Sequence, residues 1–91
     1  MLFRSFPTMC LEIVRKKLSI RSWRRGTKEL DLILGRFSDE NIAKLETSEL
    51  HLYEQLLSND DHLIYSWLFE KEESPKIFKI LVGKIQKSMN N

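Results

Sequence analysis

The stretch RSWRRGTKELDLILGRF, residues 21–37, contains the pattern that decides the fold. In its second half, apolar residues recur at spacings of three and four, as on one face of an α-helix: Leu30, Ile33, Leu34 and Phe37. Gly26 separates this pattern from a basic run that ends the preceding segment. The stretch is therefore predicted to form the end of one helix, a turn and a second helix.

Similar patterns extend over most of the 91 residues, which contain only three glycines and two prolines. Helices are predicted over about residues 11–25, 27–45 and 47–57. A short fourth helix is expected after SNDD (58–61), and a fifth after SP (74–75). The short connections favour antiparallel neighbours. We predict an all-α fold, a compact five-helix bundle in a single domain over residues 11–89, preceded by a flexible tail at residues 1–10.

Local capping signals place the ends of these helices. With Gly26 as N-cap, Glu29 falls at the third helical position, where its carboxylate can reach back to a free backbone N–H. The polar side chains of SNDD are expected to bond nearby backbone N–H groups. Ser74 is expected to cap the last helix, with Pro75 at its first position.

Positive charge is concentrated in the N-terminal third, although the net charge of the chain is only +2: Arg15, Lys16, Lys17, Arg21, Arg24, Arg25 and Lys28. Acidic residues dominate residues 38–73. Such a basic end suits an acidic protein surface, a phosphate-bearing ligand or nucleic acid, and an ordinary solvated face explains it equally well.

Motifs for catalysis and metal binding are missing from the sequence. Cys10 is the only cysteine, so neither an intrachain disulfide nor a cysteine zinc site can form. His51 and His62 have no partner at ligand spacing. No phosphate-binding loop, nucleophile motif or apolar run long enough to span a membrane occurs. We therefore expect no catalytic residue and no metal site.

The turn RGTKE (25–29) is the strongest candidate for a binding site. Local helix capping explains Gly26 and Glu29, but it leaves Arg25 unexplained. An exposed turn that offers a fork-shaped donor, a bare backbone and a fixed acid can make several directional contacts with a partner.

The segment RKKLSIRSWRRGTKELDLILGRF (15–37) resembles the hallmark region of the succinate dehydrogenase flavinylation factor family. The family motif RGxxE falls on Arg25, Gly26 and Glu29, and the following ELD ends at Asp31. Downstream, YEQLLSNDDHLIYSWLF (53–69) is similar to the family's later pattern of paired leucines, an acidic cap and a tryptophan: Leu56, Leu57, Asp60, Asp61 and Trp67. The resemblance covers about residues 12–87.

This resemblance implies a small five-helix assembly factor that binds the flavoprotein subunit of succinate dehydrogenase, or of fumarate reductase, and promotes covalent attachment of FAD to it. Arg25, Gly26 and Glu29, with Arg24 and Asp31 beside them, would then lie on the contact surface. The chemistry would belong to the partner, so we expect neither an enzyme nor a stably bound cofactor. We further expect a monomer in the bacterial cytoplasm, with the mitochondrial matrix as the alternative, and no nucleic-acid or membrane partner. The alternative function is that of a small basic nucleic-acid-binding or antitoxin-like regulatory protein.

Overall fold

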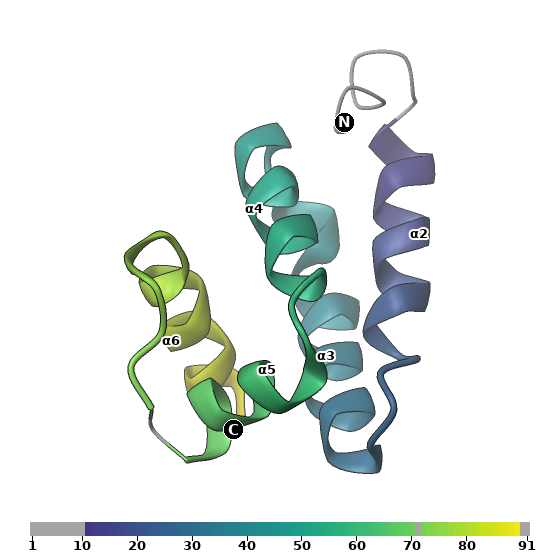
Figure 1. The fold of residues 1–91 in the computed structure, drawn as a ribbon. Helices are drawn as coiled ribbons and strands as arrows, with labels where there is room; N and C mark the ends of the chain where they lie inside the picture. Colours follow the sequence, from purple (N-terminus) through teal and green to yellow (C-terminus); the bar gives the residue numbers. More distant parts are fainter. Residues whose placement is uncertain (1–10, 71, 90–91) are drawn as a thin grey trace.

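The computed structural model describes residues 11–70 and 72–89. These ranges form five α-helices and no strand (Figure 1): α2 (Leu11–Ser22), α3 (Lys28–Asn41), α4 (Thr47–Leu57), α5 (Asp61–Phe69) and α6 (Lys79–Met89). Two short 3₁₀ turns, η1 (Ile42–Lys44) and η2 (Lys76–Phe78), extend α3 and precede α6. The predicted all-α, five-helix fold is confirmed. The predicted tail at residues 1–10, including Cys10, lies outside the described residues.

Helix α3 occupies the middle of the bundle. It contacts α2 on one side and α6 on the other, while α4 also packs against α2 and α5 packs against α6 (Figure 1). The apolar faces of all five helices meet in one core, formed by Val14, Leu18, Leu30, Leu34, Phe37, Leu45, Leu50, Tyr53, Leu56, Leu57, Ile64, Trp67, Leu68, Phe78, Leu81, Val82 and Ile85. Leu30, Leu34 and Phe37 of the stripe that predicted α3 therefore lie in the interior, and Ile33 is partly buried against it.

One polar cluster lies within this core. The hydroxyls of Ser22 and Tyr53 hydrogen-bond to each other, Ser22 Oγ donates to the carbonyl of Leu18 at 2.8 Å, and Tyr53 Oη lies 3.4 Å from the carbonyl of Leu34. Both side chains are fully buried. Burial raises the pKa of the Tyr53 phenol to about 12, because the charged form would lose its hydration. These hydrogen bonds join α2, α3 and α4 at one point.

The C-terminal end of α3 is closed by side chains. The amide of Asn41 donates to the carbonyl of Phe37 at 2.9 Å. Arg15 of α2 donates from Nε to the carbonyl of Ile42 and from Nη2 to that of Leu45, at 3.1 and 2.9 Å. Arg15 thus links α2 to the chain just beyond α3. The predicted single helix to residue 45 therefore ends at Asn41 and continues as the tighter turn η1.

Two capping predictions are wrong. In SNDD, the side chains of Ser58 and Asn59 donate to carbonyls at the end of α4, instead of accepting from N–H groups at the start of α5. Asp60, at the N-cap of α5, makes no side-chain capping bond. Pro75 precedes the turn η2 instead of beginning a helix, and Ser74 is buried behind it.

Candidate functional site

The turn between α2 and α3 is longer than the sequence indicated. Helix α2 ends at Ser22, before the predicted end at Arg25. The N-cap of α3 is Thr27, whose hydroxyl accepts from the backbone N–H of Leu30 at 3.1 Å. Thr27 has the extended backbone that an N-cap requires, together with a side-chain oxygen, and Gly26 offers neither. The expected N-cap at Gly26 is therefore wrong, and Glu29 occupies the second helical position, not the third.

Gly26 has a backbone conformation that other residues rarely adopt. Its φ is +135°, in the region that favours glycine. A Cβ at this position would lie 3.0 Å from Oδ2 of Asp61, at the start of α5. The backbone conformation thus favours glycine here, and a Cβ would in addition press against the carboxylate of Asp61.

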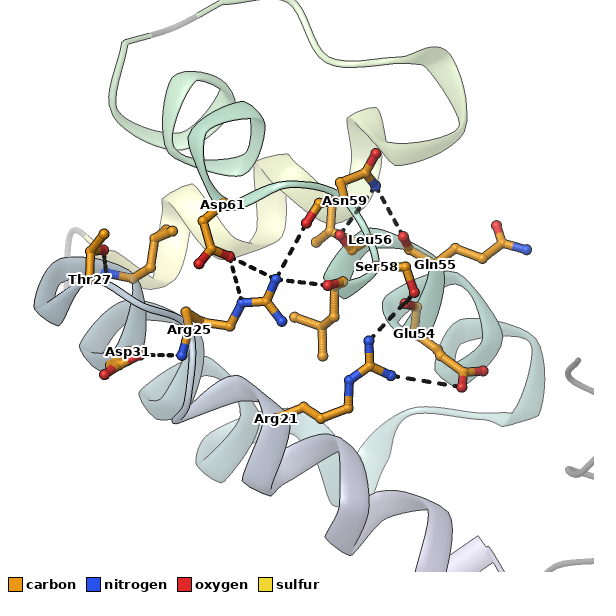
Figure 2. A network of polar contacts seen from close by, with 12 residues as sticks. Arg21, Arg25, Thr27, Asp31, Glu54, Gln55, Leu56, Ser58, Asn59 and Asp61 are labelled. Atoms are coloured by element: carbon orange, nitrogen blue, oxygen red, sulfur yellow. Dashed lines mark hydrogen bonds and ion pairs between the residues drawn. The ribbon is translucent and has the colours of Figure 1, made fainter.

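The guanidinium of Arg25 points into the protein and binds the connection between α4 and α5 (Figure 2). Nε and Nη2 lie 3.0 and 2.8 Å from Oδ1 of Asp61. Nη2 also donates to the carbonyl of Leu57 at 2.8 Å, and it lies 3.4 Å from that of Asn59. The side chain is only 11% exposed. Arg25 therefore ties the α2–α3 turn to the α4–α5 connection.

Asp31 holds the same residue from the other side. Its carboxylate, in the first turn of α3, accepts a hydrogen bond from the backbone N–H of Arg25. Two carboxylates, from Asp31 and Asp61, thus fix the main chain and the side chain of Arg25. This arrangement sets the path of the chain through Gly26.

The rim of the turn is exposed. Arg24, Lys28 and Glu29 are all exposed, and their side chains make no hydrogen bond or ion pair within the described ranges. The five residues predicted to contact a partner therefore divide into two groups. Arg25 and Asp31 brace the turn, whereas Arg24, Gly26 and Glu29 lie at its surface. Contact with a partner stays a prediction for each of them.

Trp23 covers the second glycine of this region. A Cβ on Gly35 of α3 would collide with the indole ring of Trp23, and the indole N–H lies 3.3 Å from Oδ1 of Asp39. The absence of a side chain at Gly35 therefore permits Trp23, the residue after the end of α2, to pack closely against α3. The ring nevertheless stays 39% exposed beside the turn.

The basic run does not form a uniform cationic face. Arg15 and Arg25 donate to backbone carbonyls, and Arg21 lies 3.8 Å from the carboxylate of Glu54. The remaining cations of the run are exposed: Lys16, Lys17, Arg24 and Lys28. The run therefore serves partly as scaffold.

Asp61 is the residue of this site that the sequence analysis did not assign to it. It appeared only as part of an acidic cap, yet it binds Arg25 and borders Gly26. The sequence signal for Asp61 was the pair of acids that follows the paired leucines. This signal predicts a carboxylate at the start of a helix, but it does not indicate which residue the carboxylate binds.

In residues 11–70 and 72–89, no three His, Cys, Asp or Glu side chains lie together as a metal site would require. Within the same ranges, no helix has the length and apolarity needed to cross a bilayer.

The fold and the site together define a small helical protein with a polar turn that is braced from inside and exposed at its rim. The chain belongs to the Sdh5 family, described as the flavinator of succinate dehydrogenase, whose model matches residues 16–89.

Relatives of two kinds match this chain. A mitochondrial succinate dehydrogenase assembly factor 2 from Dictyostelium discoideum is 43% identical over 75 residues, which are 82% of this chain and 53% of the relative. The FAD assembly factor SdhE of Coxiella burnetii is 42% identical over 65 residues, 69% of this chain and 78% of the relative. The chain thus spans about half the length of this mitochondrial relative and more of the bacterial one. No solved structure matches it.

Proposed function

We propose that this protein is an assembly factor that binds the flavoprotein subunit of succinate dehydrogenase and promotes covalent attachment of FAD to it. Membership of the Sdh5 family supports the proposal, as do the names of relatives in both bacteria and mitochondria. The flavoprotein subunit of fumarate reductase, which the family resemblance also implies, is a second candidate partner.

In this proposal the turn between α2 and α3 is the contact surface. The geometry of the turn is the observation that supports this choice of site. Arg25 and Asp31 keep the turn in one conformation before any partner arrives. A preformed surface loses little conformational entropy on binding. Glu29 and Arg24 at the rim, with the bare backbone of Gly26 between them, then supply the directional contacts.

The protein acts by orientation in this account. It holds the flavoprotein in the geometry in which the acceptor histidine and the flavin of that subunit react, so no acid–base group of its own takes part. FAD stays with the flavoprotein and is not bound stably by this chain. We assign it to the bacterial cytoplasm, with the mitochondrial matrix as the alternative, and expect it to act as a monomer.

A nucleic-acid-binding role is the alternative from a different class. The structure lends it little support, because several cations of the basic run are bonded to the chain itself. Binding to a random DNA duplex across a salt series would separate the two, since neutralised phosphates give a steep salt dependence. We expect no tight, salt-sensitive binding.

The proposal is tested by producing the flavoprotein subunit with and without this protein. In-gel flavin fluorescence after denaturation reports covalent FAD alone. More fluorescence in the presence of this protein is the expected result, and equal fluorescence in both samples would refute the proposal.

A further inference from the structure

A groove of about 430 Å³ lies beside the turn, along the outer face of α5. Its wall includes Thr27 at the start of α3, and its other lining residues come from α5 and its C-cap: Asp61, His62, Tyr65, Ser66 and Glu70. Asp61 is shared between this groove and the Arg25 tie. The groove is therefore continuous with the proposed contact surface.

Carboxylates stand at both ends of the groove. Asp61 begins α5, and its Oδ1 binds Arg25, whereas Oδ2 makes no hydrogen bond within the described residues. Glu70 follows the last residue of α5 and is exposed, accepting only the hydroxyl of Ser66 at 3.1 Å. The rise of an α-helix places the Cα atoms of these residues about 13 Å apart.

Tyr65 lines the groove and lies between the two carboxylates along α5. Tyr65 is half-buried, and its ring centroid lies 4.6 Å from that of Phe69, the last residue of α5. Aromatic side chains that are only half covered are typical of interface anchors, because they bury much area at small entropic cost. The groove thus combines an apolar centre with acidic ends.

We propose that this groove binds an extended segment of the flavoprotein partner that carries an apolar side chain between two basic ones. The separation of the carboxylates corresponds to about four residues of extended chain. Phosphate or another anion is disfavoured as an occupant, because Asp61 and Glu70 would repel it. The inference rests on the proposed function and adds a second contact surface to the turn.

Charge reversal at the exposed end of the groove tests the proposal. Binding of the purified flavoprotein subunit is measured with the full chain as wild type, Glu70→Lys and Glu40→Lys. Glu40 is equally exposed but lies in α3, outside the groove, and its reversal changes the net charge by the same amount. Glu70→Lys is expected to weaken binding about tenfold and to lose part of that effect at high salt. Glu40→Lys is expected to stay within about twofold of wild type. Equal effects of the two reversals would overturn the proposal.

A photo-crosslinking residue keeps the test decisive if Glu70→Lys perturbs the fold. Placed at His62 in the groove, it should cross-link to the flavoprotein; placed at Ile80 on α6, which is 76% exposed, it should not. A cross-link from position 62 to a second copy of this chain, or from position 80 alone, would refute the groove as the docking site. If wild type binds and raises covalent FAD while Glu70→Lys and position 62 behave as controls, only the groove inference fails. Loss of binding and of covalent FAD with wild type itself would remove the proposed function as well.

Discussion

Arg25 and Asp61 lie 36 positions apart in the chain, and together they join the turn after α2 to the start of α5. The side chain of Arg25 is mostly buried, and its guanidinium also donates a hydrogen bond to the carbonyl of Leu57. An arginine in a family motif is readily interpreted as a contact residue. Here its geometry makes it a brace that holds the turn between α2 and α3.

Replacing Arg25 should therefore destabilise the fold, whereas replacing its neighbour should not. We expect Arg25→Ala to lower the free energy of unfolding by about 2 kcal/mol, because Asp61 and two carbonyls lose their donor. Arg24→Ala, at an exposed side chain with no partner within the described residues, should change it by less than about 0.5 kcal/mol. Urea unfolding followed by circular dichroism measures both, and equal stabilities would contradict the assignment of Arg25 as a brace.

The two exposed glycines should respond in opposite directions to alanine. Gly26→Ala is expected to cost about 1–3 kcal/mol, because a φ of +135° is strained for alanine and its Cβ would crowd Asp61. Gly83→Ala is expected to stabilise the protein by about 0.5–1 kcal/mol, because Gly83 lies inside α6 and a Cβ there meets nothing within 4 Å. Thermal unfolding of both variants checks the pair. If Gly26→Ala were as stable as wild type, the turn would not need glycine at this position.

The buried phenol of Tyr53 should make stability fall at alkaline pH. Its folded-state pKa of about 12 is above the ordinary value of 10, so the folded protein holds the proton more tightly than the unfolded chain. This contribution is fully present below pH 10 and is lost as the pH rises from 10 through 12. A shift of two units is worth about 3 kcal/mol.

Urea unfolding from pH 8 to 11 measures the first part of this loss, which begins above pH 10. Tyr53→Phe is the control: it loses the hydrogen bonds to Ser22 and Leu34 and is less stable at neutral pH, but it should lack the part of the alkaline decline that Tyr53 causes. Identical declines in the two proteins would show that other groups cause it.

The helices were predictable from the sequence, because the apolar spacing of residues such as Leu30 and Leu34 determines which face is buried whatever the neighbours are. The helix ends were less predictable, since they depend on which donor reaches which carbonyl. Asn41 and Arg15 close the end of α3, and the second of these comes from another helix. No local pattern contains that information.

The position of the turn between α2 and α3 was predictable from the sequence, but the contacts that its residues make within the fold were not. From the sequence, helix capping offered a local role for Gly26 and Glu29 but none for Arg25, which was therefore interpreted as a residue that contacts a partner. In the structure Arg25 has an internal partner, whereas the side chain of Glu29 makes no hydrogen bond or ion pair within the described residues. The difference arises because Asp61 approaches through the tertiary fold, from a segment whose distance along the chain hides the pairing.

We propose that the exposed rim of this turn, and not its braced interior, contacts the flavoprotein. This proposal is tested most directly by measuring covalent FAD on the flavoprotein subunit with wild type, with Glu29→Ala and with Glu40→Ala as the exposed control on the same helix. The free energy of unfolding of Glu29→Ala should lie within about 1 kcal/mol of the wild-type value, because only a helix-dipole interaction is lost. With Glu29→Ala, the flavin fluorescence of the flavoprotein subunit should nevertheless fall towards that of the sample without this protein. With Glu40→Ala, the fluorescence should stay at the wild-type level. Full flavinylation with a folded Glu29→Ala variant would contradict the account.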